Sequence, residues 1–123
     1  MPNFGFVLLY VDNPERSAAF YAELLGRPPL EQSPTFAMLA LNEGAMLGLW
    51  SRHTVEPKAA AAPGACEVGF KVAEPAAVDK TYADWQARSI AMAQPPTDMD
   101  FGRTFVALDP DGHRIRVFCP VAP

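Results

Sequence analysis

The stretch LDPDGHRIRVF, residues 108–118, joins a turn to a strand with two different faces. Asp-Pro-Asp-Gly is a typical tight-turn sequence. Side chains alternate along an extended chain, so Ile115 and Val117 share one face while Arg116 and Phe118 share the other. The aliphatic face predicts burial in a core. The other face raises the question of what an arginine beside an aromatic ring contacts.

Composition limits the possible answers. The chain has 123 residues, of which 50% are hydrophobic and 20% charged, which predicts one compact domain with a real core. The net charge is −4 and no Lys/Arg cluster occurs, so a nucleic-acid partner is not expected. There is neither a signal-peptide pattern nor an apolar run of about 18 residues, so we expect a cytoplasmic protein with no membrane partner.

An internal repeat organises the chain. FVLLYVDNPERSAAFYAELLG (6–26) aligns with EVGFKVAEPAAVDKTYADWQA (67–87), and TFAMLALNEGAMLGLW (35–50) aligns with TFVALDPDGHRIRVF (104–118). The second alignment pairs Trp50 with Phe118. Between the halves, PKAAAAPGA has the composition of a linker. We therefore predict a single domain, 1–123, made of a module at 1–56, a linker at 57–65 and a module at 66–123.

Each half predicts a strand, a helix and further strands. The first helix has Asn13 as its N-cap, Pro14 at its first position and Gly26 as its stop. The second begins near Pro75, and Trp85 falls on the side of this helix that packs against a sheet. After each helix, apolar strands alternate with turns. The predicted fold class is α+β, with the order βαβββ occurring twice.

Two such modules, with a helix entered through VDNPERSAAFYAELLG and a final hairpin on DPDGHRIRVF, resemble the vicinal oxygen chelate superfamily. This superfamily includes glyoxalase I, extradiol dioxygenases and bleomycin-resistance proteins. The resemblance implies a cup-shaped half-barrel of about eight strands, with the ligand held on the cup surface. Arg116 and Phe118 would then lie on the cup face.

The resemblance also implies where metal ligands would stand. In metal-dependent members, four ligands come from the first and last strands of the modules, and these positions correspond to Phe6, Gly48, Glu67 and Arg116. Only Glu67 can bind a divalent ion, because guanidinium has no free acceptor and the other two lack donor atoms. We therefore predict no metal, no cofactor and no catalytic residue. Instead we expect Glu67 and Arg116 to form an ion pair, the alternative being that Arg116 reaches solvent.

The other cup positions are mostly apolar and suit a flat ligand that stacks. Gly48 is expected to leave a gap beside Trp50 in which such a ligand could lie. Arg103 either faces the cup or pairs with Asp98 or Asp100 on the surface, and some of the aromatic residues could instead fill a dimer interface. The predicted ligand-binding residues are Phe6, Leu8, Met46, Gly48, Trp50, Glu67, Arg103, Arg116 and Phe118.

These features favour a metal-free homodimer similar to the bleomycin-resistance branch, which sequesters a small aromatic or amphipathic compound and so confers antibiotic resistance. One alternative is a metal-dependent enzyme of the glyoxalase or dioxygenase type. Another is a metal-free acid/base enzyme that uses Glu67. For that carboxyl group, burial would raise the pKa and Arg116 would lower it, and the sequence leaves the outcome open.

Overall fold

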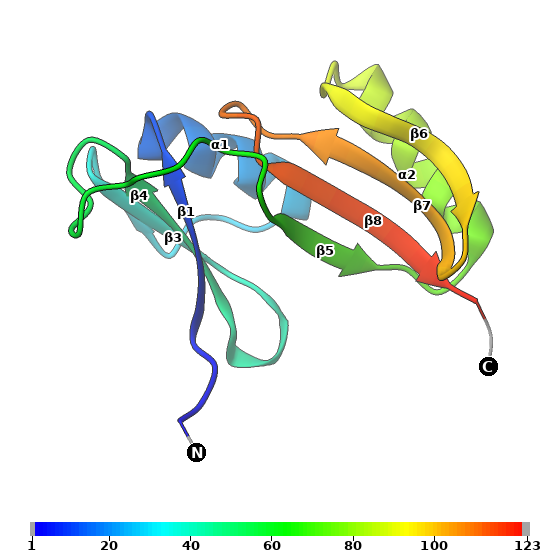
Figure 1. The fold of residues 1–123 in the computed structure, drawn as a ribbon, viewed down its shortest axis with the longest axis horizontal. Helices are drawn as coiled ribbons and strands as arrows, with labels where there is room; N and C mark the ends of the chain where they lie inside the picture. The colour runs from blue at the N-terminus through cyan, green and yellow to red at the C-terminus, as the bar shows by residue number, and fades with distance from the viewer. Residues whose placement is uncertain (1, 122–123) are drawn as a thin grey trace. The chain divides into compact units, whose positions relative to one another are not determined.

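The computed structural model describes residues 2–121, which form two compact units divided between Pro63 and Gly64. Each unit contains a strand, a helix and three further strands (Figure 1). The predicted α+β class with two βαβββ modules is therefore confirmed. The first module consists of β1 (Phe6–Val11), α1 (Pro14–Leu25), β2 (Glu31–Gln32), β3 (Phe36–Ala40), the short 3-10 turn η1 (Asn42–Gly44) and β4 (Met46–Ser51). The second consists of β5 (Glu67–Lys71), α2 (Pro75–Ala87), β6 (Met92–Met99), β7 (Gly102–Leu108) and β8 (Arg114–Pro120).

The two sheets have the same topology. Their strand orders are β1-β4-β3-β2 and β5-β8-β7-β6, so the first and last strands of each module are parallel neighbours. Val7 pairs with Leu47 in the first sheet, and Val68 pairs with Ile115 in the second. The internal repeat aligns these two pairs with each other. The repeat seen in the sequence therefore holds down to the register of the strands.

The ends of α1 follow from local chemistry. The side chain of Asn13 accepts a hydrogen bond from the backbone N–H of Arg16 at 3.1 Å, and Pro14 occupies the first turn. Gly26 ends the helix in the left-handed conformation, with φ of 67°, and its N–H is donated to the carbonyl of Ala22. The predicted N-cap, first position and stop are all confirmed.

Each helix covers one face of its own sheet. In the first module Tyr21 of α1 is fully buried, together with Leu39, Leu47 and Leu49 of the sheet. In the second module, where α2 covers β7 and β8 (Figure 1), Trp85 packs edge-on against Phe105 of β7 at 5.4 Å between ring centroids. The predicted packing of Trp85 between helix and sheet is confirmed. The opposite face of each sheet carries the candidate site.

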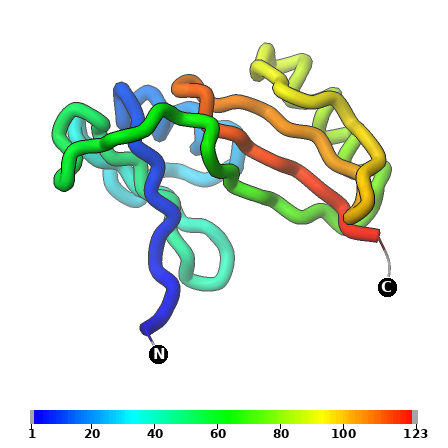
Figure 2. The backbone as a smooth tube through the Cα atoms, viewed as in Figure 1, coloured from blue at the N-terminus to red at the C-terminus, as the bar shows by residue number. Residues whose placement is uncertain are grey.

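Two strands had no individual signal in the sequence. β2 is only two residues long, and β6 contains Pro95 and Pro96 and pairs with β7 through two register shifts. Proline cannot donate to a ladder and is tolerated at a sheet edge or a bulge, which is where β6 lies. The path of β6 beside β7 can be followed in Figure 2, where β6 is yellow and β7 is orange.

Within residues 2–121, neither helix has the length and apolar character needed to span a membrane.

Candidate functional site

The face of the first sheet that points away from α1 is apolar and aromatic. Alternation along the strands places Leu9 and Val11 in the core, and leaves Phe6, Leu8 and Tyr10 between 39% and 47% exposed. Register pairing puts Met46, Gly48 and Trp50 opposite these three residues of β1. Strand β3 adds Phe36 and Met38 opposite Trp50 and Gly48. We call this surface the aromatic face: Phe6, Leu8, Tyr10, Phe36, Met38, Met46 and Trp50.

Gly48 does not leave the open gap expected from the sequence. A Cβ atom at this position would lie 2.5 Å from Cδ2 of Leu8 and 3.3 Å from Cζ of Phe36, so these two side chains fill the space above the glycine. The glycine is buried and allows the neighbouring side chains to approach its backbone. Trp50 packs edge-on against Phe36, with ring centroids 6.3 Å apart. A flat ligand would therefore contact Leu8 and Trp50 and leave Gly48 covered.

The corresponding face of the second sheet is built around an ion pair. Arg116 Nε donates to Glu67 Oε1 at 2.6 Å and Nη2 donates to Oε2 at 3.2 Å, a two-pronged arrangement. Glu67 stands directly opposite Arg114, whereas Arg116 stands opposite Gly69. No side chain at Gly69 intervenes, so the guanidinium reaches diagonally across to Glu67. The predicted ion pair is confirmed, and the alternative of a solvent-directed Arg116 is wrong.

Three further residues surround Arg116, and none of them was among the ligand-binding residues predicted from the sequence. Its Nη1 donates to Thr104 Oγ1 at 3.1 Å and to Gln94 Oε1 at 3.4 Å, and its guanidinium carbon lies 5.8 Å from the ring centroid of Phe101. Phe101 also meets Phe118 edge-on at 6.4 Å. We call this group the arginine cluster: Glu67, Gln94, Phe101, Thr104, Arg116 and Phe118. It combines a fixed guanidinium with two aromatic rings.

The charge state of Glu67 follows from this geometry. Hydrogen bonding from Arg116 is the largest influence and lowers the pKa of the carboxyl group, and partial burial opposes it to a smaller extent. The effect of Arg116 on the pKa of Glu67 therefore outweighs the effect of burial, a balance that the sequence left open. A carboxylate with a lowered pKa is a poorer proton acceptor, so Glu67 is better suited to orienting Arg116 than to acid/base chemistry.

Arg103 lies outside the arginine cluster, contrary to its place among the predicted ligand-binding residues. It is paired with Cys119, on the face of the sheet that packs against α2. Its Nη2 and Nε bind the carboxylate of Asp79 at 2.9 and 3.0 Å, and Nη1 binds Asp98 at 2.9 Å. The predicted surface pairing with Asp98 is correct, and Asp79, which belongs to α2, is a second partner. Arg103 therefore fastens α2 to its sheet.

The residues at the superfamily's metal positions do not suit a metal ion. Phe6 lies on the aromatic face, Gly48 is covered, and Arg116 already donates to Glu67. No three His, Cys, Asp or Glu side chains come together as a metal site anywhere between residues 2 and 121. A carboxylate engaged by an arginine is a poor ligand for a second cation, so no metal-dependent step is assigned to this site.

The ion pair should show measurable energetic coupling. We expect Glu67→Gln and Arg116→Met each to destabilise the protein, and the double variant to be less destabilised than the sum by about 1 kcal/mol. Because the pKa of Glu67 is lowered in the folded state, this coupling should be present at pH 7 and lost as the pH falls through that lowered value. Urea unfolding of the wild type, the two single variants and the double variant measures this coupling, at pH 7 and at an acidic pH below the lowered pKa of Glu67.

Arg114→Met is the matched control for this cycle, since Arg114 lies on the same strand and acts on Glu67 only through space. Its coupling to Glu67→Gln should be a few tenths of a kcal/mol at most. Coupling of equal size for Arg114 and Arg116 would show that the hydrogen-bonded geometry is not what stabilises the pair.

Several known proteins are similar to this chain in sequence and in fold. The Glyoxalase/Bleomycin resistance protein/Dioxygenase superfamily matches residues 3–117. The phenazine antibiotic resistance protein EhpR of Enterobacter agglomerans is 36% identical over 118 residues, covering 93% of this chain and 88% of EhpR. The solution structure of protein ATC0852 from Agrobacterium tumefaciens is 52% identical, with a TM-score of 0.90 and coverage of 99% and 100% of the two chains. A superfamily structure from Nocardioides is 26% identical, with a TM-score of 0.81 and coverage of 98% and 85%.

Proposed function

Because the chain belongs to the Glyoxalase/Bleomycin resistance protein/Dioxygenase superfamily, we propose that it is a metal-free binding protein that sequesters a small, flat aromatic or amphipathic compound. The arginine cluster is the observation that carries this proposal. It presents a guanidinium held in place on several sides, next to two aromatic rings. Such a site offers both a hydrogen-bond donor and a stacking surface, and it needs no reaction step.

The charge on Arg116 is already balanced by Glu67, so a ligand need not be an ion to bind beside it. The ring of Phe101 is 42% exposed, and its surface is available for stacking. A flat molecule with a few polar edge atoms suits the arginine cluster, because its faces gain from burial and its edge atoms can accept hydrogen bonds. The aromatic face of the first module is a second candidate surface for such a molecule and is considered by itself.

The relative EhpR suggests which probe to try first. Its name associates it with phenazine antibiotics, which contain a flat tricyclic ring system. We extend to this chain only the chemical class, a planar heteroaromatic compound, and propose drug resistance by stoichiometric sequestration. In this mechanism the bound compound is kept from its target and is released unchanged.

Binding of phenazine tests the proposal. In a Trp85→Phe background, saturable quenching of Trp50 emission is expected, because Trp50 is then the remaining tryptophan and lies on the aromatic face. Trp50→Ala should weaken binding by about 1 to 3 kcal/mol, or roughly 5- to 150-fold, as expected for loss of an aromatic contact. Because Trp50→Ala removes the emission signal, its affinity is measured by calorimetry.

Calorimetric titration of Arg116→Met and Phe101→Ala with phenazine tests the arginine cluster, and Arg88→Met, at the C-cap of α2, is the matched control because it removes an arginine from an exposed ion pair. We expect the first two to weaken binding and the control to leave it unchanged. If phenazine and a panel of other planar heteroaromatic compounds neither bind nor raise the melting temperature, the binding-protein proposal is wrong.

A metalloenzyme is the competing function, and metal content separates the two. We expect less than about 0.1 equivalent of Zn, Ni, Fe or Mn per chain after purification without chelators, because Phe6, Gly48 and Arg116 supply no ligand atoms. Elemental analysis measures this directly. About one equivalent of metal, lost on Glu67→Gln, would instead support an enzyme of the glyoxalase or dioxygenase type.

Two further parts of the proposal concern the setting of the protein. We propose that it acts in the cytosol and forms a homodimer in which part of the aromatic face is covered. Phe6 of this face, which is 47% exposed, and Phe4, which precedes β1 and is 71% exposed, are the side chains that such an interface would cover first. Sedimentation analysis of the wild type and of Phe4→Ser would test the pairing separately from ligand binding.

A further inference from the structure

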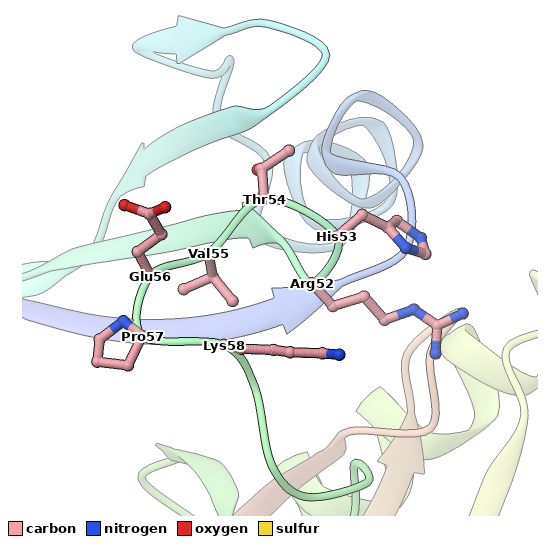
Figure 3. A pocket seen from close by; sticks show the side chains of 7 residues that line it. All are labelled: Arg52, His53, Thr54, Val55, Glu56, Pro57 and Lys58. Carbon is pink, nitrogen blue, oxygen red and sulfur yellow. The ribbon is translucent and has the colours of Figure 1, made fainter.

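A pocket lies in the first module, on the segment that follows β4. Seven consecutive residues line a cavity of about 880 Å³, which we call the loop pocket (Figure 3): Arg52, His53, Thr54, Val55, Glu56, Pro57 and Lys58. It is separate from the arginine cluster, which belongs to the second module. Its volume falls within the range of about 300 to 1,000 Å³ typical of small-molecule sites.

The first part of the loop pocket is held in place by its own hydrogen bonds. The N–H of Arg52 is donated to the carbonyl of Val11 at 2.8 Å, and the N–H groups of Thr54 and Val55 are donated to the carbonyl of Ser51 at 3.1 and 3.0 Å. Val55 is only 4% exposed and anchors the segment in the core. A wall fixed in this way loses little conformational freedom when a ligand binds.

Basic side chains dominate one side of the pocket. Figure 3 shows Arg52, His53 and Lys58 extending to the same side of the loop, whereas Glu56 points to the other. Asp12 of the neighbouring segment is the acidic partner: its Oδ1 lies 2.7 Å from His53 Nε2 and 3.4 Å from Arg52 Nη2. Lys58 has no ion-pair partner among residues 2–121. With Asp12 ionised, Arg52 and Lys58 give this side of the loop one net positive charge, and Glu56 on the other side brings the pocket as a whole to neutrality.

We propose that the loop pocket binds a small molecule through a phosphate group. The oxygens of a phosphate group can accept two parallel hydrogen bonds from the planar guanidinium of Arg52 and a third from the ammonium group of Lys58, and its negative charge is attracted to the basic side of the loop. Arg52 is poorly satisfied by its 3.4 Å contact with Asp12, so it can turn to the phosphate while Asp12 keeps His53. The cavity is larger than a phosphate ion, so it has room for an organic group attached to it.

Calorimetric titration of the intact protein with inorganic phosphate, pyrophosphate and AMP tests this proposal. Saturable binding of at least one probe is expected below about 10 mM, and Arg52→Gln and Lys58→Gln should each weaken it about fivefold, the change expected for loss of one charge contact of about 1 kcal/mol. Asp12→Asn should strengthen it, because it removes the competing carboxylate. Tighter binding of AMP than of inorganic phosphate would show that the organic group is also held, and equal binding would show that the phosphate alone is recognised.

Lys80→Gln on α2 and Arg88→Gln at its C-cap are the matched controls, since they remove the same charge from the chain at exposed positions outside the pocket. They should leave binding of the phosphate probes within about twofold of the wild type, at constant ionic strength. The proposal is overturned if no probe binds the wild type, or if the controls weaken binding as much as Arg52→Gln and Lys58→Gln do. Circular dichroism of each variant confirms that the fold is retained.

Discussion

Gly102→Ala is expected to destabilise the protein by about 3 kcal/mol or more. Gly102 begins β7 with φ of 145°, a conformation that side-chain-bearing residues rarely adopt, and a Cβ atom there would collide with the backbone carbonyl of Cys119. The backbone strain and the overlap each contribute about 1 to 3 kcal/mol. The overlap cannot be relieved by rotating a side chain, because the obstructing atoms belong to the paired strand β8. Urea unfolding measures the loss.

Gly112→Ala is the matched control for this effect. Gly112 also has a positive φ, of 91°, but a Cβ atom there would meet nothing within 4 Å. It should therefore show the backbone strain alone, about 1 to 2 kcal/mol. If both variants are destabilised equally, the close approach of β8 to Gly102 has no energetic role, and the strand pairing at this end of the sheet would need revision.

Phe105→Ala should have the largest effect of any truncation in the second module, about 3 to 5 kcal/mol. The ring of Phe105 is fully buried, and it meets Tyr82 and Trp85 of α2 edge-on, both at 5.4 Å between centroids. Removing it leaves a cavity between α2 and the sheet that rigid neighbours cannot fill. The melting temperature and the free energy of unfolding should fall together.

Phe101→Ala provides the comparison, because it removes the same atoms from the same hairpin at a residue that is 42% exposed. We expect it to cost about 1 kcal/mol of stability while weakening ligand binding. The two substitutions thus separate a residue of the core from a residue of the site. Equal losses of stability would mean that Phe101 is part of the core, and its assignment to the arginine cluster would fail.

Sequence reasoning worked where contacts follow from strand periodicity, from the repeat or from the resemblance to the superfamily. The pairing of Glu67 with Arg116 was inferred from the resemblance, because both residues stand at positions that bind one metal ion in metal-dependent members. The core positions of β1 and β4 followed from the alternation of side chains along a strand. The inference about the core rests on backbone geometry, which a strand pattern determines, whereas the inference about the ion pair rests on the resemblance.

The missed features depend on contacts that no pattern encodes. Gln94 joins Arg116 from a strand interrupted by two prolines and two register shifts, so its face could not be assigned from alternation. Asp79 binds Arg103 across 24 residues of sequence, through the packing of α2 on its sheet. The space above Gly48 is filled because the side chain of Leu8 leans over it, and side-chain direction is set by neighbours in the folded state.

The position of β8 has a consequence for how the second module is made. β8 is the last strand of this module along the chain, yet it lies between β5 and β7 in the sheet. During synthesis on the ribosome, β5 therefore has no partner until β8 emerges, and Glu67 waits for an arginine that is 49 residues further on. We expect the nascent module to expose unpaired strand edges during that interval, a condition that favours aggregation. The arginine cluster is therefore complete only when β8 fills the middle of the sheet.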